Sequence, residues 1–225
     1  MINKHTKSKQ RVADHGEVFT AEREVNAMLD LVKQETERIE SRFFEPACGT
    51  GNFLAETLRR KLAVVKRKYK KNPPDYEVNA VLAITSIYGV ERLQDNVDQC
   101  QARLFEIFDK EYTAICKKHA NNETREAVIH ILRRNILCGD ALTLKTPDQN
   151  NPLPLVFSEW SMIGNLLKRR DFEFQELVEA ATLAESGENN VLRRGIQNDK
   201  GETVFMPVEV RHFPPVHYRG VQLYD

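Results

Sequence analysis

Hydrophobic residues recur every three or four positions in long parts of the chain, which is the pattern of amphipathic helices. Between Asn52 and Lys71, for example, Leu54, Leu58 and Leu62 fall on one helical face. Thr20 is suited to cap the first of these segments, because its hydroxyl can accept a hydrogen bond from a free helix N–H. The expected helices span residues 22–39, 52–71, 96–118, 123–134 and 170–185.

Short apolar runs separate these helical segments and predict buried strands. The adjacent prolines Pro73 and Pro74 are expected to end the second helix, because proline has no N–H to donate within a helix. After Gly201, apolar residues followed by Pro214 and Pro215 predict a hairpin or an extended arm. The expected strands span residues 43–47, 80–91, 136–138 and 153–157.

Strands that alternate with helices of this length predict an α/β fold with a mostly parallel sheet flanked by helices. Ligands of such sheets bind beside the carboxyl ends of the strands, and we call this edge the rim. Four segments are expected to meet there, namely residues 45–53, Glu91, Gly139–Asp140 and 158–160.

Composition and charge narrow the class of protein. With 225 residues, the chain is long enough for one sizeable hydrophobic core. Its 33 basic and 33 acidic residues balance, so any contact with DNA has to use a local basic patch. There is no apolar run of about 18 residues that would span a membrane, and no apolar segment of a secretion signal follows the basic N-terminus. We therefore expect a cytoplasmic protein.

The four cysteines are spread along the chain without paired spacing, which indicates reduced residues of a cytosolic protein. They are Cys48, Cys100, Cys116 and Cys138. Cys116 and His119 form the only pair with metal-like spacing, and we expect no metal site from a single pair.

The turn between the first strand and the second helix carries the clearest chemical signal. Gly49 and Gly51 can adopt positive φ and let backbone amides approach a ligand closely. The next helix opens at about Asn52, so its free N–H groups suit a carboxylate. Glu45 precedes the turn, where its carboxylate can bind an ammonium group. The turn therefore suits a ligand that carries both a carboxylate and an ammonium group.

Two further acids are expected on the rim. Glu91 ends the second strand, where an acidic residue commonly binds both ribose hydroxyls of a nucleotide, and Asp140 can accept from an adenine amino group. Each acid alone is equally typical of an ordinary strand end or turn. Their order, together with the glycine turn, favours a nucleoside ligand. Leu54 stands where a dinucleotide-binding motif has its third glycine, which argues against a nicotinamide or flavin cofactor.

Residues 45–53, with the sequence EPACGTGNF, resemble the (D/E)PACG(S/T)GNF motif of adenine-N6-specific DNA methyltransferases. Gly16–Thr20 resembles the family's G-x-(F/Y)-(Y/F)-T-P segment, although Ala21 replaces the proline. The resemblance covers roughly residues 11–160. It implies a Rossmann-like class I fold that binds S-adenosylmethionine (SAM), with its carboxylate and ammonium groups at the glycine turn, and methylates DNA in a restriction-modification or phage context. The cofactor-binding residues that it implies are Phe19, Thr20, Glu45, Pro46, Ala47, Cys48, Gly49, Gly51, Asn52, Phe53, Glu91, Asp140 and Ala141.

The catalytic part of the family pattern is only partly present. The family has (N/D/S)-P-P-(Y/F/W) after the fourth strand, where a side-chain oxygen and a backbone carbonyl accept the amino hydrogens. The aromatic ring stacks on the flipped base. Here residues 157–160 are Phe-Ser-Glu-Trp, so the candidate catalytic residues are Ser158, Glu159 and Trp160. The Asn-Pro-Pro-Asp at residues 72–75 lacks the final aromatic residue and is expected to be a helix stop.

Two interpretations follow from the missing prolines. Either residues 157–160 form a divergent catalytic loop, or the chain binds SAM and needs a partner subunit for activity and target recognition. Few residues follow Trp160, so we expect a sheet that is incomplete at the C-terminus and no separate target-recognition domain. The expected organisation is a flexible basic tail (1–15), a SAM-binding methyltransferase domain (16–185) and a C-terminal extension (186–225).

Two basic clusters are candidates for contact with DNA phosphates. One is Lys168–Arg170, and the other is a group of side chains on the second helix. Each cluster is also compatible with an ordinary solvated surface, and the basic N-terminal tail with either a solvated terminus or a DNA-binding arm. The group on the second helix is Arg59, Arg60, Lys61, Lys66, Arg67, Lys68, Lys70 and Lys71.

Overall fold

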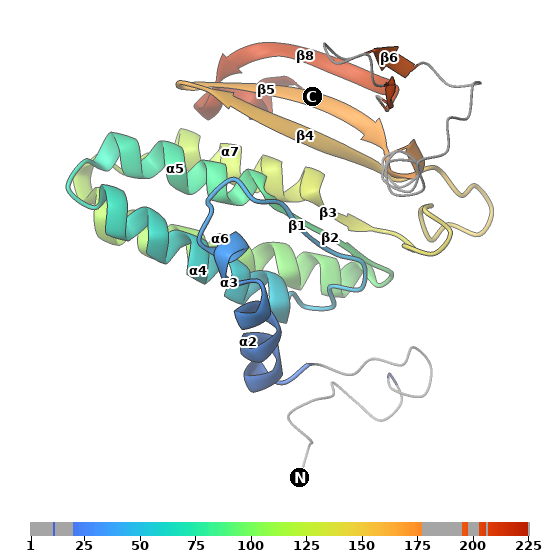
Figure 1. Ribbon diagram of the computed structural model, residues 1–225, viewed down its shortest axis with the longest axis horizontal. Coiled ribbons are helices and arrows are strands. Elements are labelled where there is room, and N and C mark those ends of the chain that lie inside the picture. The colour runs from blue at the N-terminus through green and yellow to red at the C-terminus, as the bar shows by residue number, and fades with distance from the viewer. Residues whose placement is uncertain (1–10, 12–19, 177–194, 198–202, 206, 225) are drawn as a thin grey trace.

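The computed structural model describes residues 11, 20–176, 195–197, 203–205 and 207–224. Its main elements are a parallel sheet, an antiparallel sheet and the helices around them (Figure 1). Val90 of the parallel sheet and Phe157 of the antiparallel sheet belong to one cluster of buried hydrophobic side chains, so the two sheets share a core. Phe19 and the second half of the predicted last helix lie outside the described residues.

The parallel sheet has three strands in the order β1-β2-β3. They are β1 (Phe43–Glu45), β2 (Ile87–Glu91) and β3 (Ile136–Cys138). β1 and β3 each pair in parallel with the central β2. The sheet confirms the predicted α/β class and the predicted positions of the first and third strands.

Helices fill both crossovers between the parallel strands. They are α4 (Asn52–Tyr69), α5 (Pro73–Thr85), α6 (Gln94–Cys116), the short 3-10 helix η1 (Lys117–His119) and α7 (Asn122–Asn135). α4 packs on β1 and β2, and α6 packs on β2 and β3. The predictions of helices at residues 52–71, 96–118 and 123–134 are confirmed. No helix in the described part of the chain combines the length and the apolar character that crossing a membrane requires.

The prediction of a strand that begins at Ala80 is wrong, because residues 73–85 form α5. Pro73 and Pro74 lie in the first turn of this helix, where a missing N–H costs nothing. Tyr76, Ala80, Val81, Ala83 and Ile84 are all fully buried. A helix that is apolar on most sides lacks a clear polar face, so its sequence gives the same pattern as a buried strand.

The first predicted helix is interrupted at Val32, whose backbone has φ −117° and ψ 32°. This residue separates α2 (Glu22–Leu31) from α3 (Lys33–Thr36). Ala21, and not Thr20, is the N-cap residue, and its N–H donates to Glu24 Oε2 at 3.2 Å. The apolar face of α2 packs against Phe43 and Phe53 and so lies beside the start of α4.

The antiparallel sheet consists of β4 (Val156–Ile163), β5 (Leu166–Glu173) and β8 (Glu209–His217). It lies over α5 and α7 (Figure 1). The expectation of a fourth parallel strand at residues 153–157 is therefore wrong, because β4 pairs with β5 in the opposite direction. The predicted helix at 170–185 is wrong at its start, since residues 170–173 belong to β5.

The hairpin between β4 and β5 has a sequence signal that the helical interpretation overlooked. Ile163 pairs with Leu166, so only Gly164 and Asn165 form the turn. Gly164 has φ +59°, the left-handed conformation that tight hairpin turns require. A Gly-Asn pair between two apolar runs is a typical two-residue hairpin connection.

The remaining C-terminal elements are β6 (Gly195–Gln197), which pairs with β7 (Thr203–Phe205), and η2 (Tyr218–Tyr224). η2 packs on α7 and is held by the buried Glu77 of α5. The Glu77 carboxylate accepts hydrogen bonds from three other elements. The donors include Arg219 Nε of η2 at 2.7 Å, Tyr112 Oη of α6 at 2.7 Å and Thr124 Oγ1 of α7 at 2.8 Å. Burial alone would raise the pKa of Glu77, but these hydrogen bonds hold it below its ordinary value.

Candidate functional site

Parallel pairing brings the predicted rim residues together. Glu45 lies opposite Gly89, and Glu91 lies opposite Cys138, so the carboxyl ends of β1, β2 and β3 form one edge. The N–H of Gly139 continues this pairing by donating to the carbonyl of Glu91 at 2.9 Å. Three of the four segments predicted at the rim therefore meet there. They are residues 45–53, Glu91 and Gly139–Asp140.

The turn after β1 has the backbone conformation that its glycines predict. Gly49 has φ +51° and Gly51 has φ +80°, both in the left-handed region. The N–H of Cys48 donates to Val90 at 3.0 Å, which attaches the turn to the end of β2. A Cβ at Gly51 would lie 2.5 Å from Cys100 Sγ, so a larger residue would displace the Cys100 side chain in addition to straining the backbone.

Arg103 of α6 supports the same turn, and the sequence did not point to it. Its Nη1 donates to the carbonyl of Thr50 at 3.1 Å and to Asn52 Oδ1 at 2.5 Å. Asn52 Nδ2 in turn donates to the carbonyl of Thr20 at 3.2 Å. Arg103 lies about 50 residues after the turn, so no local sequence pattern connects the two.

No side chain caps the start of α4. The N-cap residue is Gly51, and the first turn has no acidic residue. The prediction that the helix opens at Asn52 is confirmed. Uncapped N–H groups at a helix start favour an anionic group of a ligand, because the helix dipole adds a partial positive charge there.

Glu91 is fixed by the backbone around it. The N–H of Gly49 donates to Oε2 at 3.0 Å, and the N–H of Leu93 donates to Oε1 at 3.0 Å. Asn96 Nδ2 lies 3.4 Å from the same Oε1. A carboxylate has about four acceptor sites, so Glu91 can accept a further hydrogen bond from a ligand hydroxyl.

Glu45 is the unusual group of the rim. Its Oε2 is buried and has no hydrogen-bond partner among the described residues. Burial, and then the nearby Glu91 carboxylate, raise the pKa of Glu45 to about 7. A buried carboxylate without a partner is costly, so this position suits a cation that arrives with a ligand.

Asp140 has a structural role in its own loop. Its Oδ1 accepts from the N–H of Leu142 at 2.8 Å, and its Oδ2 lies 3.7 Å from Arg92 Nε. One oxygen thus closes the turn, and the other faces a largely exposed arginine. Ala141 lies in the same turn and is half-buried.

The other predicted cofactor residues surround the turn. Pro46 and Ala47 form its exposed start, whereas Cys48 is buried. A hydrogen bond with Cys100, followed by burial, raises the pKa of the Cys48 thiol, so this thiol stays protonated. Phe53 is partly buried and packs against both the main core and the small cluster that α2 forms with β1.

The catalytic candidates do not form a loop at the rim, so that expectation is wrong. Ser158, Glu159 and Trp160 lie inside β4. Ser158 is buried, and its Oγ donates to Asp171 Oδ1 at 2.7 Å. Glu159 Oε1 accepts from Arg42 at 2.6 Å. These contacts give both side chains structural partners within the fold.

Trp160 is only 6% exposed, and its Nε1 donates to Asn135 Oδ1 of α7 at 2.8 Å. In this position the indole ring cannot stack on a flipped base without leaving the core. We expect Trp160→Phe to lower the free energy of unfolding by about 1–2 kcal/mol, because Asn135 Oδ1 loses its donor in a buried site.

Urea unfolding followed by circular dichroism measures this loss. Tyr69→Phe is the control, because the Tyr69 hydroxyl has no hydrogen bond to another described residue, and its effect should stay below about 0.5 kcal/mol. Equal stabilities of the Trp160→Phe variant and the wild type would contradict the buried role of the indole N–H.

A cavity of about 530 Å³ lies away from the rim. It is lined by residues of α7 and η2, and α7 ends where β3 begins, at the opposite edge of the parallel sheet. Its lining contains none of the predicted site residues, so it gives no alternative location for the same ligand. The lining residues are Glu126, Ile129, His130, Arg133, Arg134 and Gln222.

The rim therefore combines a glycine turn, an uncapped helix start, an acid held by backbone amides and a buried acid with an unpartnered oxygen. In the described part of the chain, no three His, Cys, Asp or Glu side chains are placed to hold a metal ion. Comparisons of the chain with protein family models, with curated proteins and with solved structures find no match.

Proposed function

We propose that this chain binds SAM at the rim and is the cofactor-binding part of a SAM-dependent DNA methyltransferase of the adenine-N6 type. The observation that carries this proposal is the buried Oε2 of Glu45, which has no partner among the described residues and lies beside the glycine turn. An ammonium group of an amino-acid ligand would supply the missing donor and charge. The motif at residues 45–53 supports SAM as the ligand and adenine in DNA as the methyl acceptor.

Each part of SAM has a chemically suited group on the rim. The ammonium group suits Glu45, and the carboxylate suits the uncapped start of α4 at Asn52. The ribose hydroxyls suit Glu91, which retains acceptor capacity, and the adenine amino group suits Asp140. SAM brings an electrophilic methyl group, so the role of these residues is to bind and orient it.

The groups that contact the target adenine are proposed to come from outside the described residues of this chain. Ser158, Glu159 and Trp160 belong to a buried strand, and their side chains bond within the fold. This observation favours a component that needs a partner polypeptide for methyl transfer over a divergent catalytic loop. Such a partner would also supply target recognition.

Titration calorimetry with SAM and with its demethylated product, S-adenosylhomocysteine, tests the proposed ligand. We expect saturable binding of both with one site per chain. Incubation with tritiated SAM and unmodified DNA then tests whether the chain acts alone, and we expect binding without label in the DNA. Absence of binding at millimolar ligand would refute the proposed function, and label in DNA would refute the need for a partner.

Asp140→Asn should weaken SAM binding by about 1–3 kcal/mol. Asparagine can keep the hydrogen bond from the N–H of Leu142, but its amide places a donor where the adenine amino group needs an acceptor. The matched control is Asp148→Asn, because Asp148 Oδ1 accepts from the N–H of Asn150 at 2.9 Å in a similar turn. Equal SAM affinity of both variants would exclude the proposed role of Asp140.

A further inference from the structure

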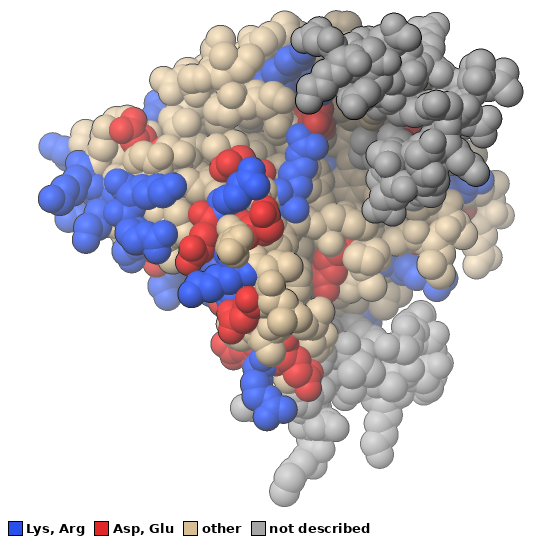
Figure 2. All heavy atoms as spheres, viewed as in Figure 1, with Lys and Arg blue, Asp and Glu red and all other residues tan. Residues whose placement is uncertain are grey.

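Lysine and arginine side chains gather at one end of the molecule, where α4 ends and α5 begins (Figure 2). Arg67, Lys68, Lys70 and Lys71 are all exposed there. η1 adds Lys117 and Lys118, because Cys116, directly before them, contacts the carbonyl of Pro73 with a sulfur–oxygen distance of 3.6 Å. We call these six side chains the basic end.

The basic end is not neutralised by neighbouring acids. None of its six side chains has an ion pair among the described residues. Glu111 of α6 is bound to Lys66 at 2.9 Å, and Asp75 accepts from Asn72. Glu123, at the start of α7, is the other exposed acid close to η1 in the chain. The C-terminal end of a helix carries a partial negative charge of about half an elementary charge. This is too small to neutralise all six cations of the basic end.

Four side chains of the basic cluster predicted on α4 do not belong to the basic end. One is Lys66, which binds Glu111. Arg59 lies 3.5 Å from Glu56, and Arg60 binds Asp30 at 2.8 Å. Lys61 is fully buried and donates to the backbone carbonyls of the segment before β1, at residues 38, 39 and 41. The exposed cations of this cluster that have no ion pair among the described residues therefore lie in the last turn of α4 and directly after it.

The surroundings of the basic end favour a contact with phosphates. Between Glu45 and Ala141, the stretch that contains the basic end, no large hydrophobic side chain of the described residues is exposed. A protein interface usually has apolar or aromatic anchors, and membrane-surface helices insert apolar side chains. Lysines and arginines without such anchors are typical of surfaces that contact the sugar-phosphate backbone of nucleic acids.

We infer that the basic end binds the phosphate backbone of duplex DNA, at a place separate from the rim. α4 starts at the glycine turn and has 18 residues, so its far end lies about 27 Å from the rim. Contact with phosphates at the basic end reads no base, because phosphates carry no sequence information. The basic end would therefore anchor DNA irrespective of its sequence, while the base is contacted elsewhere in the assembly.

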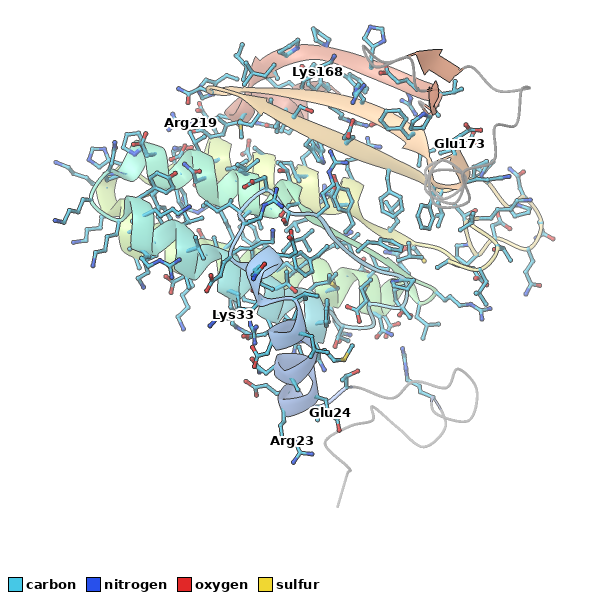
Figure 3. The ribbon with its side chains drawn as sticks, viewed as in Figure 1. Arg23, Glu24, Lys33, Lys168, Glu173 and Arg219 are labelled. Carbon is cyan, nitrogen blue, oxygen red and sulfur yellow. The ribbon has the colours of Figure 1, made fainter. Side chains whose placement is uncertain are left out.

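Fluorescence anisotropy with a labelled duplex of about 20 base pairs, recorded between about 50 and 200 mM salt, tests this inference. We expect Lys70→Glu/Lys71→Glu to raise the Kd at least about tenfold and to reduce the slope of log Kd against log salt by about 2. The matched control is Arg23→Glu/Lys33→Glu on α2 and α3, which changes charge equally at exposed positions far from the basic end (Figure 3). This control should change the Kd less than about twofold, because binding depends on the local patch.

Several results would overturn the inference. They are absence of DNA binding by the wild-type chain, an unchanged Kd of the basic-end variant, or an equal loss of affinity in the control. Tighter binding of polyglutamate than of DNA would instead assign the basic end to an acidic protein. SAM titrations of both variants keep the two proposals apart, because we expect unchanged SAM affinity whether or not DNA binds.

Discussion

Glu45→Gln is expected to make the protein more stable at pH 8 and to weaken its binding of SAM. Burial, followed by the neighbouring Glu91, raises the pKa of Glu45 to about 7, so the folded chain carries an unfavourable buried charge at pH 8. Glutamine has nearly the same shape and no charge. The free energy of unfolding should therefore rise by about 1–3 kcal/mol at this pH.

The pH dependence distinguishes this effect from a change in packing. Between the ordinary pKa of 4.5 and the folded value of about 7, the folded chain binds more protons at Glu45 than the unfolded chain. The contribution of Glu45 is thus most favourable below pH 4.5 and is lost as the pH rises through 7. The gain from Glu45→Gln should be small at pH 4.5 and complete above pH 7.

Urea unfolding at a series of pH values measures this gain. Glu37→Gln is the control, because Glu37 is an exposed acid outside the rim. Its stability should differ from that of the wild type by less than about 0.5 kcal/mol at every pH. A destabilised Glu45→Gln variant at pH 8 would show that the Glu45 carboxylate is well satisfied in the folded chain, contrary to its unpartnered Oε2.

The same substitution should reduce SAM affinity by about 10-fold to 100-fold, because a charge-assisted hydrogen bond to the ammonium group is lost. In the wild type, SAM affinity should fall about tenfold per pH unit below pH 7, where Glu45 becomes protonated. The glutamine variant should lack this dependence. A variant that is more stable but binds SAM more weakly would show that Glu45 serves ligand binding at the expense of stability.

The rim was predictable because its determinants are local in the sequence. Gly49 and Gly51 adopt the positive φ that glycine permits, and Asn52 begins the helix that follows. Glu45 and Glu91 fall at strand ends, and parallel pairing needs only the order of the elements to bring them together. The conformation of a turn and the sequence order of helices and strands can be inferred from short segments.

The antiparallel sheet was missed because long-range pairing decided it. Residues 170–173 read Arg-Asp-Phe-Glu, which lacks the alternation of polar and apolar residues typical of a half-buried strand, and their partners in β8 lie some forty residues later in the chain. Arg169 and Asp171 are charged residues in the interior, which a hydrophobic pattern assigns to the surface. Only the fold shows that they neutralise each other.

Asp171→Ala should lower the free energy of unfolding by about 3–5 kcal/mol, a larger change than the one expected for Glu45→Gln. Arg169 and Asp171 are almost completely buried, and Arg169 binds Asp171 through two hydrogen bonds, both of 2.7 Å. Without the carboxylate, the guanidinium keeps contacts to Ser158 Oγ and the rings of Trp160 and Phe213 but has no balancing charge from Asp171.

Urea unfolding of the single and double variants measures the effect and its cause. Arg169→Met/Asp171→Leu removes both charges and keeps the volume, so it should recover most of the loss. Asp98→Ala removes an exposed carboxylate from α6 and should cost less than about 0.5 kcal/mol.

A double variant as unstable as Asp171→Ala would show that geometry, and not an unbalanced buried charge, sets the cost. Recovery in the double variant would instead show that the cost comes from an unbalanced charge in the core, which Ser158 and Trp160 help to form. Two side chains that hold such a core cannot also move to a target base at the rim. The groups that contact the base would then have to come from elsewhere in the assembly, as the proposed function requires.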